Sequence, residues 1–108
     1  FADVAILDAT FTENLPRHIS AATGIDAMVH AIEAYTSKIK KNPYADMLAK
    51  QALKLLNQNL NLVLEDGRNL EARQNMLVGS MLAGQAFANA PVGAVHALAY
   101  PLGGHFHI

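Results

Sequence analysis

The sequence predicts an all-α protein that folds as a helical bundle. Alanine and leucine dominate the composition and β-branched residues are few, which favours helices over strands. Apolar residues recur at three- and four-residue spacing along most of the chain. Asparagine, proline and glycine signals divide this pattern into segments of helical length. With 108 residues, the chain forms one domain at most.

The N-terminal segment departs from the helical pattern. Residues 4–7, Val-Ala-Ile-Leu, are an apolar run between two aspartates, and we interpret them as a buried strand. A strand cannot pair with itself, so its sheet is expected elsewhere in a longer protein. Thr12 is expected to cap a helical turn over 13–15 that Pro16 closes. The chain begins at Phe1 and stops directly after a Gly- and His-rich stretch, so we expect a fragment.

The first long helix is predicted over 20–36. Its apolar stripe at i, i+3, i+4 and i+7 consists of Ile25, Met28, Val29 and Ile32. Gly24 is costly inside a helix and is tolerable if another backbone or a ligand approaches closely there. The lysine-rich connector over 38–41 is expected to be a solvated loop.

Asn42-Pro43 is a helix start signal, with Asn as N-cap and Pro at the first helical position. This helix is predicted to last to about residue 59, where three nearby asparagines weaken it. A separate short helix is expected over 60–65 before the Asp66-Gly67 stop.

The third long helix is predicted over 69–89, with Leu70 in the core and Arg73 outside. A row of small residues, which lets a neighbouring helix come close, consists of Gly79, Ala83, Ala86 and Ala90. A shorter helix should follow the Pro91/Gly93 break, from about 94 to 100, and end at Pro101.

The composition excludes several function classes. A net charge of −1 gives no electrostatic case for a nucleic-acid or membrane-surface partner. The chain has no cysteine, hence no disulfide framework and no thiolate metal site. No apolar run is long enough to span a bilayer. A cytoplasmic protein fits these features.

Asp26 and His30 lie four apart, one above the other on a helix face. This pair is either an ordinary side-chain pair on a solvated face or part of a metal site. His96, after the Pro/Gly break, could complete a set of two histidines and one aspartate with open coordination positions. Alone, His96 is more often a structural residue. His18 has no partner at ligand spacing and is interpreted as a surface or capping histidine.

Two separated stretches carry a resemblance to a known family. AATGIDAMVHAIEAYTS and, later, GSMLAGQAFANAPVGAVHALAYPLGGHFHI resemble the iron-containing (group III) alcohol dehydrogenases over essentially the whole chain. The family's later signature is GxxHxxAHxxG, then five residues, then Pro-His-Gly. Gly93, His96, Ala99 and Gly103 match it. The family's second histidine is replaced by Tyr100 here, which puts in doubt any mechanism that needs a histidine there.

The resemblance implies an N-terminal NAD(P)-binding domain and a helical metal-binding domain. Residues 1–8 would be the last strand of the former, and 9–108 part of the latter. Asp26, His30 and His96 would be three of four ligands to Fe²⁺ or Zn²⁺. The fourth would be the histidine of Pro-His-Gly, a motif that is expected to begin directly after Ile108. His105 and His107 fall in the unspecified gap and are not taken as ligands.

The resemblance also implies a function. The parent protein is expected to oxidise a small alcohol or hydroxy acid, or to reduce the aldehyde or ketone, by hydride transfer with NAD or NADP. Tyr100 is placed on the substrate side, and a homo-oligomer is expected. The isolated chain should be inactive. Glu33 is either a carboxylate that bonds a metal ligand or the backbone, or a solvated helix glutamate. A dehydroquinate-synthase-type lyase and a non-catalytic helical module stay as alternatives.

Overall fold

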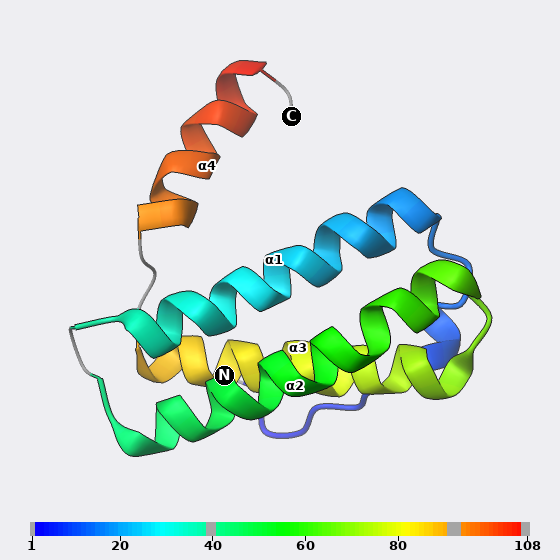
Figure 1. Ribbon diagram of the computed structural model, residues 1–108, viewed down its shortest axis with the longest axis horizontal. Coiled ribbons are helices and arrows are strands. Elements are labelled where there is room, and N and C mark those ends of the chain that lie inside the picture. The colour runs from blue at the N-terminus through cyan, green and yellow to red at the C-terminus, as the bar shows by residue number, and fades with distance from the viewer. Residues whose placement is uncertain (1, 39–40, 91–93, 107–108) are drawn as a thin grey trace.

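The computed structural model describes residues 2–38, 41–90 and 94–106. Its elements, in chain order, are a short 3₁₀ helix η1 (Ala9–Phe11) and the helices α1 (Arg17–Thr36), α2 (Pro43–Glu65), α3 (Leu70–Asn89) and α4 (Ala94–Phe106). The first three α-helices pack side by side as a bundle, and α4 projects away from one end of it (Figure 1). The all-α prediction is confirmed. No described helix combines the length and the apolar character needed to cross a membrane.

The predicted start signals of α2 and α3 form as expected. The Asn42 side chain accepts a hydrogen bond from the Ala45 amide at 2.8 Å, and Asn69 accepts one from the Ala72 amide at 3.1 Å. The predicted break near residue 59 is wrong, because α2 is continuous to Glu65. Asn59 is buried there, donating to the Leu55 carbonyl and accepting from Asn75, so its amide is satisfied without ending the helix.

The bundle core is built from small side chains. The face that α1 buries consists of Gly24, Ala27, Ala31 and Ala34 together with Ser20 and Glu33. The predicted stripe is therefore wrong in part, since Ile25 and Ile32 are about half exposed, at 50% and 47%. Small residues let neighbouring helices approach more closely than branched ones, so the alanine face is the one that packs.

Two glycines show how close this approach is. A Cβ placed on Gly24 would lie 2.7 Å from Leu60 Cδ1, and one placed on Gly79 would lie 2.9 Å from Leu56 Cγ. The space beside Gly24 is filled by the side chains of Leu60 and Met76, not by the backbone or ligand that was expected there. The row of small residues on α3 is likewise buried, at Gly79, Ala83, Ala86 and Ala90.

Arg73 is buried, which corrects the prediction that it lies outside. Its guanidinium donates to Ser20 Oγ at 2.7 Å, the Gly67 carbonyl at 2.8 Å and the Leu15 carbonyl at 3.3 Å. These bonds satisfy the buried charged group and tie the start of α1 to the α2–α3 turn. Leu70, expected in the core, is 42% exposed.

The segment before α1 contains no strand among its described residues. Val4 and Ile6 are exposed, at 77% and 87%, so the predicted buried strand over 4–7 is not observed. A strand is paired through backbone hydrogen bonds with a neighbouring strand. Here the Gln74 side chain of α3 donates to the Leu7 carbonyl and accepts from the Ala9 amide. A hydrogen-bonded turn does follow Thr12, with the Leu15 amide donating to the Thr12 carbonyl at 3.1 Å. The expected cap is wrong, because the Thr12 hydroxyl donates back to the Ala9 carbonyl at 2.9 Å. The assignment of 1–8 to a nucleotide-binding domain stays a prediction.

The last helix, α4, is longer than predicted. It continues through Pro101 to Phe106 instead of ending at residue 100. The φ angle that proline imposes is close to the helical value, so Pro101 removes one hydrogen bond without ending the helix.

Candidate metal centre

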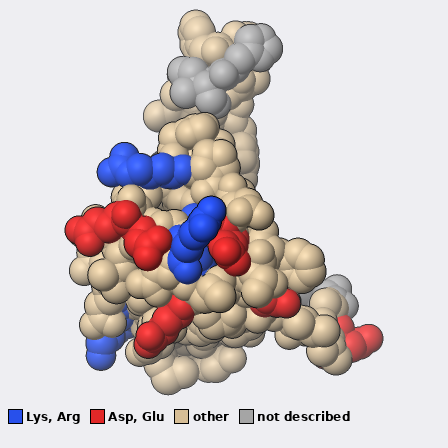
Figure 2. Space-filling model, turned by 90° about the vertical axis from the view of Figure 1, so that its right-hand side faces the viewer, with Lys and Arg blue, Asp and Glu red and all other residues tan. Residues whose placement is uncertain are grey.

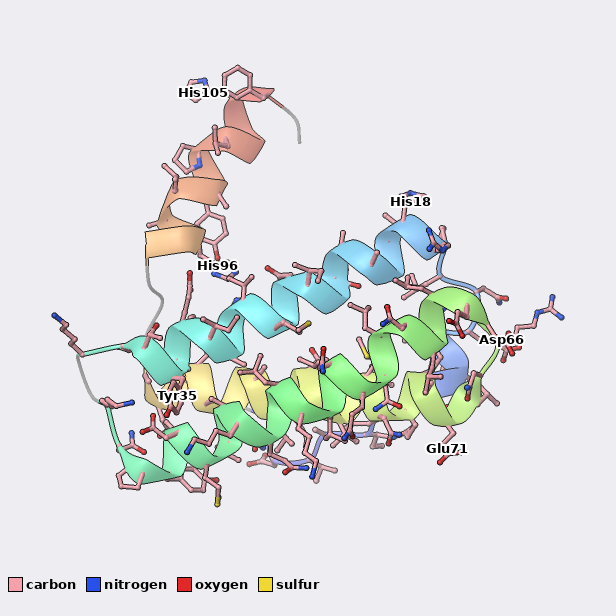
Figure 3. The ribbon with its side chains drawn as sticks, in the orientation of Figure 1. His18, Tyr35, Asp66, Glu71, His96 and His105 are labelled. Atoms are coloured by element: carbon pink, nitrogen blue, oxygen red, sulfur yellow. The ribbon has the colours of Figure 1, made fainter. Side chains whose placement is uncertain are left out.

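Asp26, His30 and His96 meet at the junction of α1 and α4. Asp26 and His30 lie one turn apart on α1, and His96 lies in the first turn of α4. One ligand atom from each of the three lies within 4.8 Å of the other two. His96 Nε2 is 3.0 Å from Asp26 Oδ1, and His30 Nδ1 is 3.5 Å from Asp26 Oδ2. Figure 3 shows His96 between the base of α4 and α1.

Ring contacts hold the two imidazoles together. The His30 and His96 rings are stacked with centroids 4.0 Å apart and planes inclined by 26°. The His30 ring also makes a T-shaped contact with Phe87 from α3, with centroids 5.1 Å apart and planes inclined by 75°. No spacing signal in the sequence predicts this contact, because His30 and Phe87 lie far apart in the chain.

The three side chains of the cluster differ in their exposure to solvent. The side chains of His96, His30 and Asp26 are 7%, 26% and 57% exposed, respectively. The cluster therefore has a fixed, desolvated base and an accessible carboxylate edge. This arrangement suits a cation that must also meet a small molecule, because a catalytic metal site keeps an open coordination position.

Glu33 supports this base and is itself only 5% exposed. Its Oε2 lies 2.8 Å from His96 Nδ1, and its Oε1 accepts a hydrogen bond from the His96 backbone amide at 3.1 Å. The interpretation of Glu33 as a solvated glutamate is wrong. Hydrogen bonds, first to Glu33 and then to Asp26, raise the pKa of His96 although its burial acts in the opposite direction.

The donor set fits a divalent transition metal. Two imidazoles and one carboxylate are ligands that both Zn²⁺ and Fe²⁺ accept, and such a set leaves positions open for a substrate oxygen. The two carboxylates near His96 also supply negative charge that a cation would neutralise. The geometry thus disfavours the alternative in which Asp26 and His30 are only a solvated surface pair.

The other predicted residues lie outside the cluster. The Tyr100 side chain is largely exposed, one turn beyond His96 on α4, with ring centroids 5.9 Å apart. His18 is exposed at the far end of α1, as expected, and His105 is exposed near the end of α4 (Figure 3). His107 lies outside the described residues.

Comparisons with known proteins place this geometry in a family. Residues 20–108 match the Fe-containing alcohol dehydrogenase family, C-terminal. The chain is 51% identical over 107 residues to long-chain-alcohol dehydrogenase 1 of Geobacillus thermodenitrificans, covering 99% of this chain and 27% of that protein. It is 48% identical over 101 residues to 1,3-propanediol dehydrogenase of Klebsiella pneumoniae, covering 94% of this chain and 26% of that protein.

A solved structure shows the same fold. Sulfoacetaldehyde reductase from Bifidobacterium kashiwanohense, in complex with NAD⁺, superposes with a TM-score of 0.93 and 36% identity, covering 100% of this chain and 28% of that one. The chain thus spans little more than a quarter of the length of its relatives. The matched residues include all of α1 to α4 except the first three residues of α1. The chain belongs to the Fe-containing alcohol dehydrogenase family.

Proposed function

We propose that the full-length protein is a metal-dependent NAD(P) alcohol dehydrogenase that interconverts a small alcohol or hydroxy acid with its aldehyde or ketone. The observation that carries the proposal is the convergence of Asp26, His30 and His96 from two helices onto one point. Family membership supports it, as do relatives named for long-chain alcohols and for 1,3-propanediol. An NAD⁺ complex of a relative supports a nicotinamide cofactor, bound by a part of the protein outside this chain.

Each residue of the cluster has its own part in this proposal. Asp26 would supply the anionic ligand at the accessible edge, and His30 and His96 the two neutral ligands behind it. Iron or zinc held there would supply Lewis-acid polarisation of the substrate oxygen. Stacking on His96 and the contact with Phe87 restrict the His30 ring, which keeps the ligand geometry fixed.

Tyr100 is proposed to face the substrate. It lies on the same side of α4 as His96, four residues later, and its side chain is exposed. A phenol can donate a hydrogen bond to a substrate oxygen. A homo-oligomer is proposed for the full-length protein on the family resemblance alone.

The experiment uses the full-length protein. Elemental analysis should find bound iron or zinc, and Asp26→Ala or His30→Ala should remove most of it. Loss of a cation that contributes several kcal/mol of transition-state stabilisation should lower kcat/KM by about 1000-fold or more. His18→Ala, on the same helix and exposed, is the matched control and should retain both metal and activity.

The same preparation separates the alternatives. Oxidation of members of a panel of alcohols and hydroxy acids with NAD⁺ or NADP⁺ is expected for a dehydrogenase, and turnover without net nicotinamide reduction would indicate the lyase. A full-length protein without bound iron or zinc, unaffected by Asp26→Ala and His30→Ala, would establish the non-catalytic module.

A further inference from the structure

The buried carboxylate of Glu33 makes two contacts with a single residue of another helix. Oε1 accepts from the His96 backbone amide at 3.1 Å, and Oε2 lies 2.8 Å from Nδ1 of the same residue. Glu33 belongs to α1 and His96 to α4, 63 positions apart in the chain. Both partners are buried, at 5% exposure each. A side chain held at both oxygens in this way has little freedom to rotate.

The backbone contact concerns the start of α4. His96 is in the first turn of that helix, where amides have no partner within the helix. A carboxylate at a helix N-terminus satisfies such an amide and interacts favourably with the helix dipole. Glu33 therefore supplies, from α1, a cap for α4. Because α4 packs along none of the other described helices, this contact has a large part in placing it.

The ring contact concerns the protonation pattern of His96. An ionised carboxylate can only accept hydrogen bonds, so the nitrogen that faces Glu33 must carry the proton. The other nitrogen, Nε2, faces Asp26 and the point where the ligand atoms converge. Without a cation, Nε2 facing the Asp26 carboxylate carries a proton by the same argument. A cation that binds at this point would displace the proton on Nε2 while Glu33 retains the one on Nδ1, so that the Nε2 lone pair is the one presented to the metal.

We propose that Glu33 is a positioning residue that caps α4 and fixes the His96 ring with its Nδ1 proton, so that Nε2 is presented to a divalent cation. This inference rests on the metal site proposed above. Glu33 is not among the three residues whose ligand atoms converge. The position of α4 and the orientation and protonation of the His96 ring therefore depend on the same side chain.

Glu33→Gln is the informative substitution because it keeps the size of the side chain. An amide has one acceptor and one donor end, whereas both contacts of Glu33 need an acceptor. If the amide oxygen faces Nδ1, its NH₂ group opposes the His96 amide. In the reverse orientation the NH₂ group opposes Nδ1–H and favours the tautomer that protonates Nε2. Either orientation disturbs the ligand.

The test compares full-length wild type, Glu33→Gln and Glu71→Gln as the matched control. Glu71 is an exposed helix glutamate at the far end of the bundle from His96 (Figure 3). The metal-free proteins are titrated with Co²⁺, followed by its visible absorption, and with Zn²⁺ against a chelator. Glu33→Gln should bind both ions about 10–100-fold more weakly, with unchanged helical circular dichroism, and Glu71→Gln should match wild type.

The outcomes separate the two proposals. Wild type that binds neither ion overturns the metal site itself. Wild type that binds both, with Glu33→Gln equal to it, overturns only the role of Glu33. A second measurement needs no variant: nitrogen-15 NMR of histidine-labelled, Zn²⁺-loaded wild type should show a proton on Nδ1 of His96. A metal-bound Nδ1 with the proton on Nε2 overturns the proposal even if Glu33→Gln fails to fold.

Discussion

The bundle of α1, α2 and α3 and the projecting helix α4 are held in place by different kinds of contact. Inside the bundle, small apolar residues are fully buried, among them Ala31, Ala34, Ala49, Ala52 and Ala83. In α4, by contrast, Leu98, Tyr100 and Phe106 are about two-thirds exposed, at 68%, 67% and 66%. The described charged side chains seen in Figure 2 gather on the bundle, while α4 carries no Lys, Arg, Asp or Glu.

This difference indicates which region should control stability and which should control metal affinity. Apolar burial and close helix approach stabilise the bundle, so its free energy of unfolding depends on how closely its side chains fit together. The junction with α4 is polar: His96 contacts Glu33, Asp26 and His30 of α1. Substitutions in the bundle core should therefore change stability, and substitutions at the junction should change metal affinity. Three predictions test this division.

The largest effect on stability is expected from Leu56→Ala. Leu56 on α2 is the largest side chain with no exposure among the described residues. Its truncation should lower the free energy of unfolding by about 2–5 kcal/mol, through lost burial and a cavity. The measurement is the denaturant midpoint of the full-length protein, followed by helical circular dichroism, with Zn²⁺ affinity measured under native conditions. Leu62→Ala, 45% exposed on the same helix, is the control and should cost much less.

An unchanged midpoint for Leu56→Ala would show that the bundle does not limit stability. A loss of Zn²⁺ affinity without a change in midpoint would break the division between the two regions.

Smaller effects on the free energy of unfolding are expected from two glycine substitutions on α3, one destabilising and one stabilising. Gly79→Ala would place a Cβ 2.9 Å from Leu56 Cγ and 3.0 Å from Leu56 Cδ2, so the Leu56 side chain or the helices must shift. This crowding should cost about 1–3 kcal/mol. Gly84→Ala on the same helix meets nothing within 4 Å and should stabilise by about 0.5–1 kcal/mol through helix propensity. The same denaturation experiment measures both, and equal effects would contradict the close α2–α3 approach.

Helix positions were predictable from the sequence because their signals are local. The Asn42-Pro43 and Asn69 starts depend on a side chain and an amide three residues later. The inner face of α1 was not predictable from periodicity, because both an aliphatic stripe and an alanine stripe have helical spacing. Which one packs depends on how closely α2 approaches Gly24, which is a tertiary property. The burial of Arg73 was not predictable for the same reason, since it bonds Ser20 on α1. The helix also continues past Asn59, whose amide is satisfied by the neighbouring turn and by Asn75 on α3.

The three residues of the candidate site were predictable from the sequence, but the residues that hold them in place were not. Helical spacing put Asp26 and His30 on one face, His96 after the Pro/Gly break could complete the set, and the family resemblance then implied all three as ligands. No local pattern places Glu33 against His96 or Phe87 against His30, because those contacts depend on where α4 and α3 lie. The order of the motif alone left Glu33 open between a buried and a solvated role.

The smallest effect is expected from His105→Ala. His105 is a histidine on α4, as His96 is, but it is exposed near the helix end, outside the cluster of ligand atoms. Its loss should leave Zn²⁺ affinity unchanged and alter the free energy of unfolding by less than about 1 kcal/mol, the scale of a charge–dipole contact near a helix C-terminus. Zn²⁺ titration and the denaturant midpoint of full-length His105→Ala, beside His96→Ala, measure this. A loss of affinity as large as that of His96→Ala would mean that the outer end of α4 also reaches the metal, so that the ligands could no longer be confined to its base.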